Sequence, residues 1–210
     1  MQTKYITPED VAKIASKLSG HSRTIWLLMC DTGLRISDAV ALRYSDIDKE
    51  GKIHYKAKKT GKIGIASPSG NVLALLGRKK TREYIFRSSV NPNKHIHRST
   101  VFKHIKRACA LCGIDAHGIA PHTARKVFAV KDFRENGLGK TMHDLQHSSA
   151  ATTLFYALSD DPIPMIFREL NALREQIEEL YELCDFICEK IGFDNEKPIN
   201  VRTSEQKKGP

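Results

Sequence analysis

A proline-containing break near residue 160 divides the chain into two parts that fold under different constraints. Two prolines occur within Asp160-Asp161-Pro162-Ile163-Pro164, and proline cannot continue a helix because it lacks the backbone N–H and clashes with the preceding turn. Beyond the break, apolar residues recur at alternating steps of four and three: Ile166, Leu170, Leu173, Ile177, Leu180, Cys184, Ile187 and Ile191. This spacing is typical of a coiled-coil seam, whereas a helix packed on its own domain usually has a broader apolar stripe. We therefore expect a coiled-coil self-association helix over 165–195 and a disordered tail over 196–210.

The part before the break, residues 1–160, has the patterns of a mainly helical α+β domain. Thr7 followed by Pro8 is a helix start signal. The spacing of apolar residues predicts further helices at about 22–33, 36–42, 72–76, 99–113, 121–137, 140–146 and 149–158. Alternation from Ile53 to Ala57 and a turn at 59–62 predict a small antiparallel sheet, which we expect to have three strands. Only six residues precede the first helix signal, so no N-terminal domain is expected.

The net charge of +10 is distributed unevenly along the chain. Residues 1–164 contain 27 Lys and Arg against 14 Asp and Glu, whereas residues 165–197 contain 4 against 9. The basic body favours a polyanionic partner, although a merely soluble basic protein is the simpler alternative. No apolar run approaches the ~20 residues of a membrane span, and no signal peptide is recognisable. Five cysteines favour free thiols in a reducing cytoplasm; Cys109 and Cys112 have zinc-like spacing, but we expect them to be buried thiols of one helix.

Four short stretches contain residues suited to phosphate chemistry. They are Arg35 after a glycine break, Lys59 in the predicted hairpin turn, the pair His122 and Arg125 on one helical face, and His147 with Tyr156 nine residues later. Taken singly, each has a structural explanation: a surface arginine, a solvated lysine, a capping or core histidine, and a buried aromatic residue. Their joint order is what points to a function.

Together these stretches resemble the tyrosine recombinase (phage integrase) family. The resemblance covers roughly residues 5–158, which correspond to the family's helical catalytic domain, and it does not include the acidic helix. The chain resembles catalytic-domain-only members, such as fimbrial-switch invertases, because the family's usual N-terminal DNA-binding domain has no counterpart here. Gln146 stands where the family commonly has glycine, and Lys126-Val127 where it usually has His-Thr. The resemblance implies six catalytic residues: Arg35, Lys59, His122, Arg125, His147 and the nucleophile Tyr156.

The resemblance further implies a site-specific recombinase that cleaves and rejoins DNA. Two guanidiniums would hold the extra negative charge of the transition state, and Tyr156 would form a covalent 3′-phosphotyrosine. In this interpretation His122 is a general base or orienting group, and Lys59 is the general acid for the 5′ oxygen. His147 would donate a hydrogen bond to a phosphoryl oxygen. The adduct keeps the energy of the broken bond, so no ATP, metal or other cofactor is expected.

Double-stranded DNA is the expected partner, bound by a homo-oligomer that forms a tetramer on synapsed sites through the C-terminal helix. An accessory DNA-binding protein is a further candidate partner, and we expect a cytoplasmic, nucleoid-associated location. Phosphate contacts are expected from seven basic residues: Lys58, Lys62, Arg78, Lys79, Lys80, Arg98 and Lys126. One alternative is a non-catalytic DNA-binding or regulatory module of the same fold that modulates a full-length integrase. Another is a type IB topoisomerase, but the small size of the chain and the order of its motifs argue against it.

Overall fold

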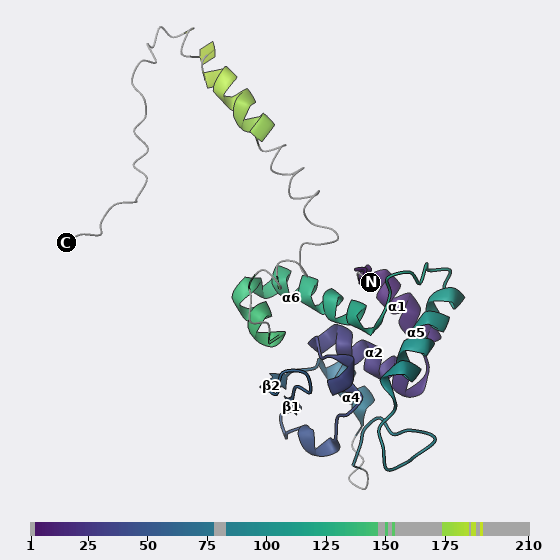
Figure 1. The fold of residues 1–210 in the computed structure, drawn as a ribbon. Coiled ribbons are helices and arrows are strands. Elements are labelled where there is room, and N and C mark those ends of the chain that lie inside the picture. The colour runs from purple at the N-terminus through teal and green to yellow at the C-terminus, as the bar shows by residue number, and fades with distance from the viewer. Residues whose placement is uncertain are drawn as a thin grey trace, which may run out of the picture. The chain divides into compact units, whose positions relative to one another are not determined.

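Helix α2 (Gly20–Thr32) is the central element before the break, and it carries Trp26, the largest fully buried side chain. In this computed structural model the described residues are 3–77, 83–146, 150, 153, 174–184, 186–187 and 190. Trp26 Nε1 donates to the Val11 carbonyl, 3.3 Å away, in α1 (Pro8–Lys17). Figure 1 shows the other helices of residues 3–146 arranged around α2, and α2 contacts each of the other α-helices described in this range. The core therefore forms around one buried helix.

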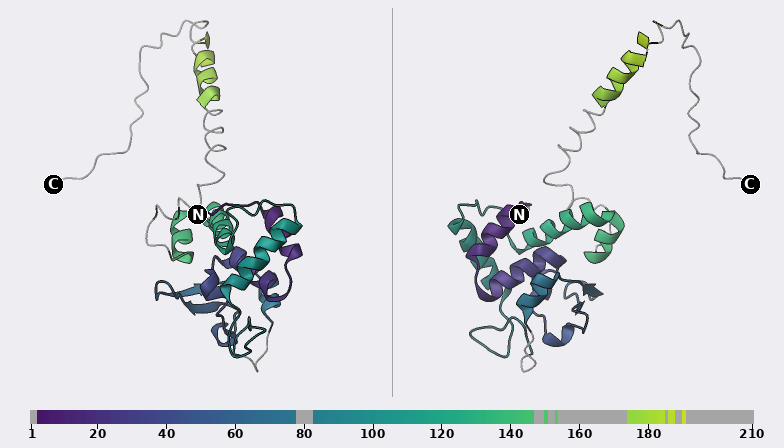
Figure 2. Two further views of the ribbon diagram at one scale, coloured as in Figure 1. Left: turned by 45° about the vertical axis from the view of Figure 1, so that its right-hand side comes forward. Right: turned by 180° about the vertical axis from the view of Figure 1, so that it is seen from behind.

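Four further helices pack around α2. They are α3 (Ile36–Ala39), α4 (Gly70–Leu76), α5 (Arg98–Leu111) and α6 (Pro121–Asp144). Views from other sides show α5 alongside α1 (Figure 2), and the two helices are in contact. Cys109 is buried on α5 and Cys112 is half-buried directly after it, both as free thiols. The mainly helical α+β class that the sequence predicted is confirmed.

A two-stranded antiparallel hairpin is the only sheet among the described residues. Strand β1 (Ile53–Lys56) pairs with β2 (Ile63–Ala66), and Tyr55 lies opposite Gly64. The sequence predicted this hairpin and its turn. The hairpin projects from the helical body beside α2 (Figure 1).

The three-stranded sheet that we expected is not confirmed: among the described residues, pairing on the far side of β1 is limited to a single bridge between Ile47 and Ile53. The 3-10 turn η1 (Tyr44–Asp46) ends directly before Ile47. The next residue, Asp48, turns the chain again by accepting the Lys52 backbone N–H at 2.8 Å. Two turns so close together leave no extended segment long enough to form a strand.

Helix α6 is broken near its C-terminal end. Gly137 has φ 76° and ψ 179°, outside the helical region, so the element consists of two helical segments. A helix ending near Asn136-Gly137 and a short helix after it were both predicted from the sequence. The chain leaves α6 at Leu145, which is fully buried. The helix expected at 149–158 lies outside the described residues, apart from 150 and 153.

The residues after the break belong to a separate unit, Asp161–Pro210. Residues 174–184 are helical, as are 186–187 and 190. All of these described residues are exposed, including the seam positions Ile177, Leu180 and Ile187. No helix in the described part of the chain combines the length and apolar character that a membrane crossing needs.

Candidate active site

The corner between α2 and α3 positions Arg35. Gly33 ends α2 in the left-handed conformation, with φ 67°, which glycine adopts without steric cost. A Cβ atom on Gly33 would overlap the Phe128 ring of α6 and lie 2.9 Å from Leu145 Cδ2. The corner is thus packed closely against α6 and the residues after it, and half-buried Arg35 follows at the N-cap of α3.

Arg125 of α6 is buried beneath this corner, with 1% of its surface exposed. Its Nη1 donates to the Gly33 carbonyl, and its Nη2 donates to the Leu145 carbonyl. A guanidinium carries five N–H donors in a planar fork, which suits it to hold two carbonyls at once. Arg125 thereby joins the corner that carries Arg35 to the end of α6, from which the chain continues to His147.

The hairpin turn carries Lys59 and is fixed to α3 by Asp38. Lys59 is exposed, and the turn closes where the Gly61 N–H donates to the Ala57 carbonyl at 2.7 Å. Asp38 is 4% exposed, and its Oδ1 accepts the Lys58 backbone N–H at 3.0 Å. Because α3 starts directly after Arg35, this bond sets the Lys59 turn relative to that arginine.

His122 lies in the first turn of α6, three residues before Arg125. Desolvation of the imidazole is the largest of the effects that lower its pKa, and the positive charges of Arg125, Arg35, Lys59 and Lys126 act in the same direction; together they bring the pKa to about 4. Such Coulombic effects weaken with distance, so three members of the expected catalytic set, Arg35, Lys59 and Arg125, are brought together around His122. The imidazole is consequently neutral at pH 7 and able to accept a proton.

The low pKa of His122 predicts a pH dependence of stability. The folded chain binds the His122 proton only near pH 4, whereas the ordinary pKa is 6.5. Between these values the unfolded state binds more protons, so the folded state loses stability as the pH falls through this window. We expect the unfolding temperature of the wild type to fall more steeply there than that of His122→Asn, which has no imidazole to titrate. Thermal unfolding of both proteins measures the difference, and parallel pH profiles would contradict the lowered pKa.

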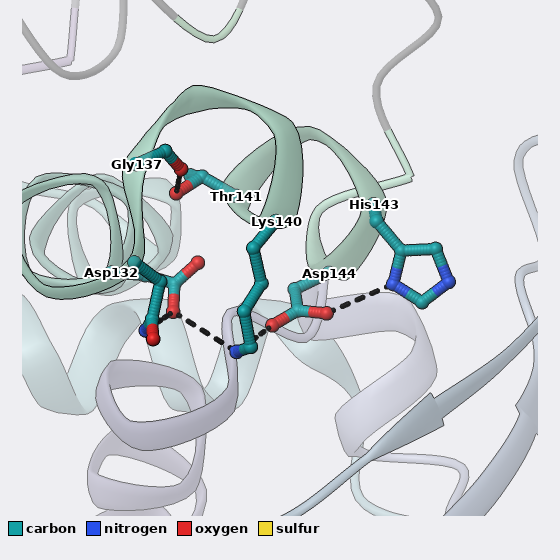
Figure 3. Close-up of polar contacts among 7 residues, drawn as sticks. Asp132, Gly137, Lys140, Thr141, His143 and Asp144 are labelled. Atoms are coloured by element: carbon teal, nitrogen blue, oxygen red, sulfur yellow. Dashed lines mark hydrogen bonds and ion pairs between the residues drawn. The ribbon is translucent and has the colours of Figure 1, made fainter.

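A polar cluster holds the two segments of α6 together across the Gly137 break (Figure 3). Lys140 Nζ lies 2.8 Å from Asp144 Oδ2 and 3.6 Å from Asp132 Oδ1. Asp132 is 5% exposed. The hydrogen bond to Asp144 raises the pKa of Lys140, so that side chain keeps its charge. The cluster therefore fixes the direction in which the chain leaves α6.

The other residues expected at the site have varied positions. Five lie outside the described residues: His147, Tyr156, Arg78, Lys79 and Lys80. Lys58 and Lys62 are exposed around the hairpin turn, and Arg98 is exposed at the start of α5. Lys126 is 3% exposed, and its Nζ donates to the Thr3 carbonyl at 3.2 Å. Contact of these residues with DNA stays a prediction.

Sequence reasoning gave no role to Asp38 or Tyr55. Burial raises the pKa of the Tyr55 hydroxyl, and the positive charges of Arg125 and Arg35 oppose that rise. The sequence does offer a sign for Asp38, because it is an acidic residue three positions after Arg35 in a basic body. Tyr55 could be recognised from the sequence only as a strand residue. The described residues contain no group of three or more His, Cys, Asp or Glu side chains placed to hold a metal ion.

Two arginines and a lysine around a neutral histidine, on a helical domain with a basic hairpin, define a class of site suited to a phosphodiester. The family model described as the phage integrase family matches residues 4–162. The chain belongs to the phage integrase family, as the sequence resemblance indicated.

Individual relatives and solved structures agree with this assignment. The chain is 29% identical over 142 residues to the "Probable integrase/recombinase YoeC" of Bacillus subtilis (strain 168), covering 65% of this chain and 77% of that protein. The fold is similar to XerA recombinase, with TM-score 0.65, 23% identity, and coverage of 85% of this chain and 65% of that chain. It is also similar to a lambda integrase tetramer bound to a Holliday junction, with TM-score 0.59, 23% identity, and coverage of 71% and 48%. The likeness to these two structures shows the shared fold, and the chain spans less than two thirds of either.

Proposed function

We propose that this chain is a site-specific DNA recombinase that cleaves and rejoins DNA through a covalent 3′-phosphotyrosine at Tyr156. The observation that carries the proposal is the convergence of Arg35, Lys59 and Arg125 on neutral His122. Membership of the phage integrase family supports it. The same strand chemistry serves integration, excision and inversion, which differ in how the DNA sites are arranged.

Strand cleavage follows from the chemistry of these side chains. The Tyr156 oxygen attacks phosphorus in line, the bond from phosphorus to the 5′ oxygen breaks, and the strand leaves as a 5′ hydroxyl. His122 accepts the phenol proton, and Lys59 on the exposed turn supplies a proton to the departing oxygen. The positive charges of Arg35 and Arg125 stabilise the negative charge that develops on the non-bridging oxygens.

Rejoining is the reverse reaction with a different strand. A 5′ hydroxyl gives its proton to Lys59 and attacks the phosphotyrosine, and the Tyr156 oxygen leaves and regains its proton from His122. His147 is proposed to donate a hydrogen bond to a phosphoryl oxygen in both directions. The phosphotyrosine ester stores the energy of the broken bond, so the cycle as proposed consumes no ATP and uses no cofactor.

Binding to duplex DNA is proposed to use the exposed basic residues near the site. Lys58 and Lys62 flank the Lys59 turn, and Arg98 begins α5. Phosphate contacts of this kind release counterions, so the affinity should fall steeply as the salt concentration rises. A lambda integrase of similar fold is a tetramer bound to a Holliday junction, and we propose that several copies of this chain likewise assemble on DNA.

The C-terminal helix is proposed to mediate that assembly, because its exposed seam residues Ile177 and Leu180 are 50% and 59% exposed in the single chain. Leu180→Asp places a charge in the seam and is expected to lower the solution mass to that of a monomer. Leu180→Met is the matched control, because it keeps an apolar side chain of similar volume in the seam, and it should keep the oligomer. Light scattering measures both masses. An unchanged mass for Leu180→Asp would show that the helix does not mediate association.

The proposed reaction is tested by covalent trapping with a pool of nicked duplexes whose central sequence is randomised. A nick beside the cleaved bond lets a short fragment diffuse away, so that rejoining fails and the adduct accumulates. Strands that stay linked to the protein under denaturing conditions are recovered and sequenced. A shared sequence among the linked strands would support the recombinase. Duplexes enriched by binding but never linked would identify the non-catalytic DNA-binding module instead.

A further inference from the structure

Gln146, the first residue after Leu145, has an unfavourable backbone conformation. Its φ of 52° is the only positive value for a non-glycine residue among those that the structure describes. The left-handed region brings Cβ close to the neighbouring carbonyl, so side chains other than glycine rarely occupy it without compensation from their surroundings. The Gln146 backbone N–H donates to the His143 carbonyl at 2.9 Å at the end of α6, and a contact of the side chain adds to the support of this conformation.

Hydrogen bonds do not supply that contact. Both Oε1 and Nε2 of Gln146 are buried, and neither has a hydrogen-bond partner within the described part of the chain. A buried amide without partners is destabilising in itself, and such groups are uncommon in folded proteins. The side chain is consequently held by packing.

The packing partner is the hairpin. A Cβ atom on Gly64 of β2 would overlap the Gln146 amide and would lie 2.8 Å from Tyr55 Cζ. Tyr55 and Gly64 face each other across the two strands. A glycine inside a strand often marks a place where another group approaches closely, and here it leaves a slot that the Gln146 side chain fills.

We propose that Gln146 is a positioning residue. Its side chain fills the slot at Gly64 and so holds the Lys59 hairpin against the end of α6, from which the chain continues to His147. The hairpin then has two attachments. At its turn, the Lys58 N–H bonds to Asp38; at β2, Gln146 fills the slot. The neighbouring Leu145 carbonyl is held by Arg125, so the second attachment reaches the buried arginine as well. The catalytic consequence rests on the proposed function, whereas the packing does not.

Two substitutions separate packing from every other role of Gln146. Gln146→Met keeps the length of the side chain but removes the amide, and Gln146→Gly relieves the backbone strain but empties the slot. We expect the methionine variant to keep the cleavage rate of the wild type. The glycine variant should form the covalent adduct about ten- to 100-fold more slowly, because small displacements of reacting groups are costly, while its DNA affinity stays within about twofold.

The readout that does not depend on activity is hydrogen exchange in the hairpin. The amides of residues 55–66 in the full-length protein should exchange faster in Gln146→Gly and at the wild-type rate in Gln146→Met. Unchanged exchange in the glycine variant, or equal acceleration in both variants, would overturn the proposal. If no protein forms an adduct, the proposed recombinase fails while the exchange experiment still decides the packing role.

A double-mutant cycle gives a second test. Gly64→Ala places a methyl group in the slot and is expected to lower the unfolding temperature, because it displaces Gln146 and crowds Tyr55. Adding Gln146→Gly should recover part of that loss, since one of the two clashing groups is removed. Strictly additive effects of the two substitutions would contradict direct packing between these residues.

Discussion

Replacing Tyr156 by phenylalanine is expected to abolish the covalent protein–DNA adduct while leaving the fold and the affinity for duplex DNA unchanged. The substitution removes one hydroxyl oxygen, and the remaining ring has no atom that can attack phosphorus. Adduct formation should therefore fall by at least about 10³-fold, as expected for loss of a nucleophile. Trapping on the nicked duplexes measures the adduct, and a filter-binding titration measures the affinity.

The matched control for this experiment is Tyr181→Phe. Tyr181 lies in the C-terminal helix and is 68% exposed, so losing its hydroxyl should leave the adduct yield unchanged. Mass spectrometry of the linked peptide identifies the attacking residue directly. An adduct that persists in Tyr156→Phe would assign the nucleophile to another side chain.

Replacing Arg125 by alanine is expected to remove the activity together with much of the stability. The substitution leaves the Gly33 and Leu145 carbonyls buried without their donor. Each unsatisfied group costs about 1–3 kcal/mol, so the free energy of unfolding should fall by about 2–6 kcal/mol. Under the proposed function, loss of the Arg125 charge should also slow cleavage by about 10²–10³-fold. Urea denaturation and adduct formation measure the two effects.

Two further substitutions define what Arg125 contributes. Arg125→Lys keeps the charge but loses the planar fork, and one ammonium group cannot reproduce the guanidinium's geometry on two carbonyls. Its stability and cleavage rate should lie between those of the wild type and Arg125→Ala. Arg134→Ala, at an exposed position of the same helix, should change stability by no more than about 0.5 kcal/mol. Equal stability of Arg125→Ala and Arg134→Ala would show that the buried bonds are not stabilising.

The elements that local sequence encodes were predicted well. Caps, glycine stops and apolar spacing indicated the helices, and strand alternation indicated the hairpin. The pair of His122 and Arg125 could be placed on one helical face because a three-residue spacing determines that geometry by itself. The approach of Arg35 and Lys59 to this pair depends on tertiary structure, and only the family resemblance anticipated it.

The features that sequence reasoning missed depend on contacts between distant segments. The expected three-stranded sheet is not confirmed, because η1 and the Asp48 turn limit the pairing beside β1 to Ile47. Gly64 gives no local sign that Gln146, more than eighty positions later, fills the space beside it. The position of Asp38 three residues after Arg35 is visible in the sequence, but its bond to the Lys58 N–H joins α3 to the hairpin and is visible only in the folded structure.

The burial of Arg125 between two backbone carbonyls affects how inactive relatives of this chain can be recognised. A relative that does not cleave DNA would still need Arg125 to satisfy the Gly33 and Leu145 carbonyls in its core, because losing the guanidinium is expected to remove much of the stability. Lys59 is exposed on a turn, and its side chain has no comparable structural role. Under the proposed function, its replacement would stop DNA cleavage and leave the fold intact. In a newly sequenced relative, Arg125 is therefore a marker of the fold, and Lys59 is the better marker of a working enzyme.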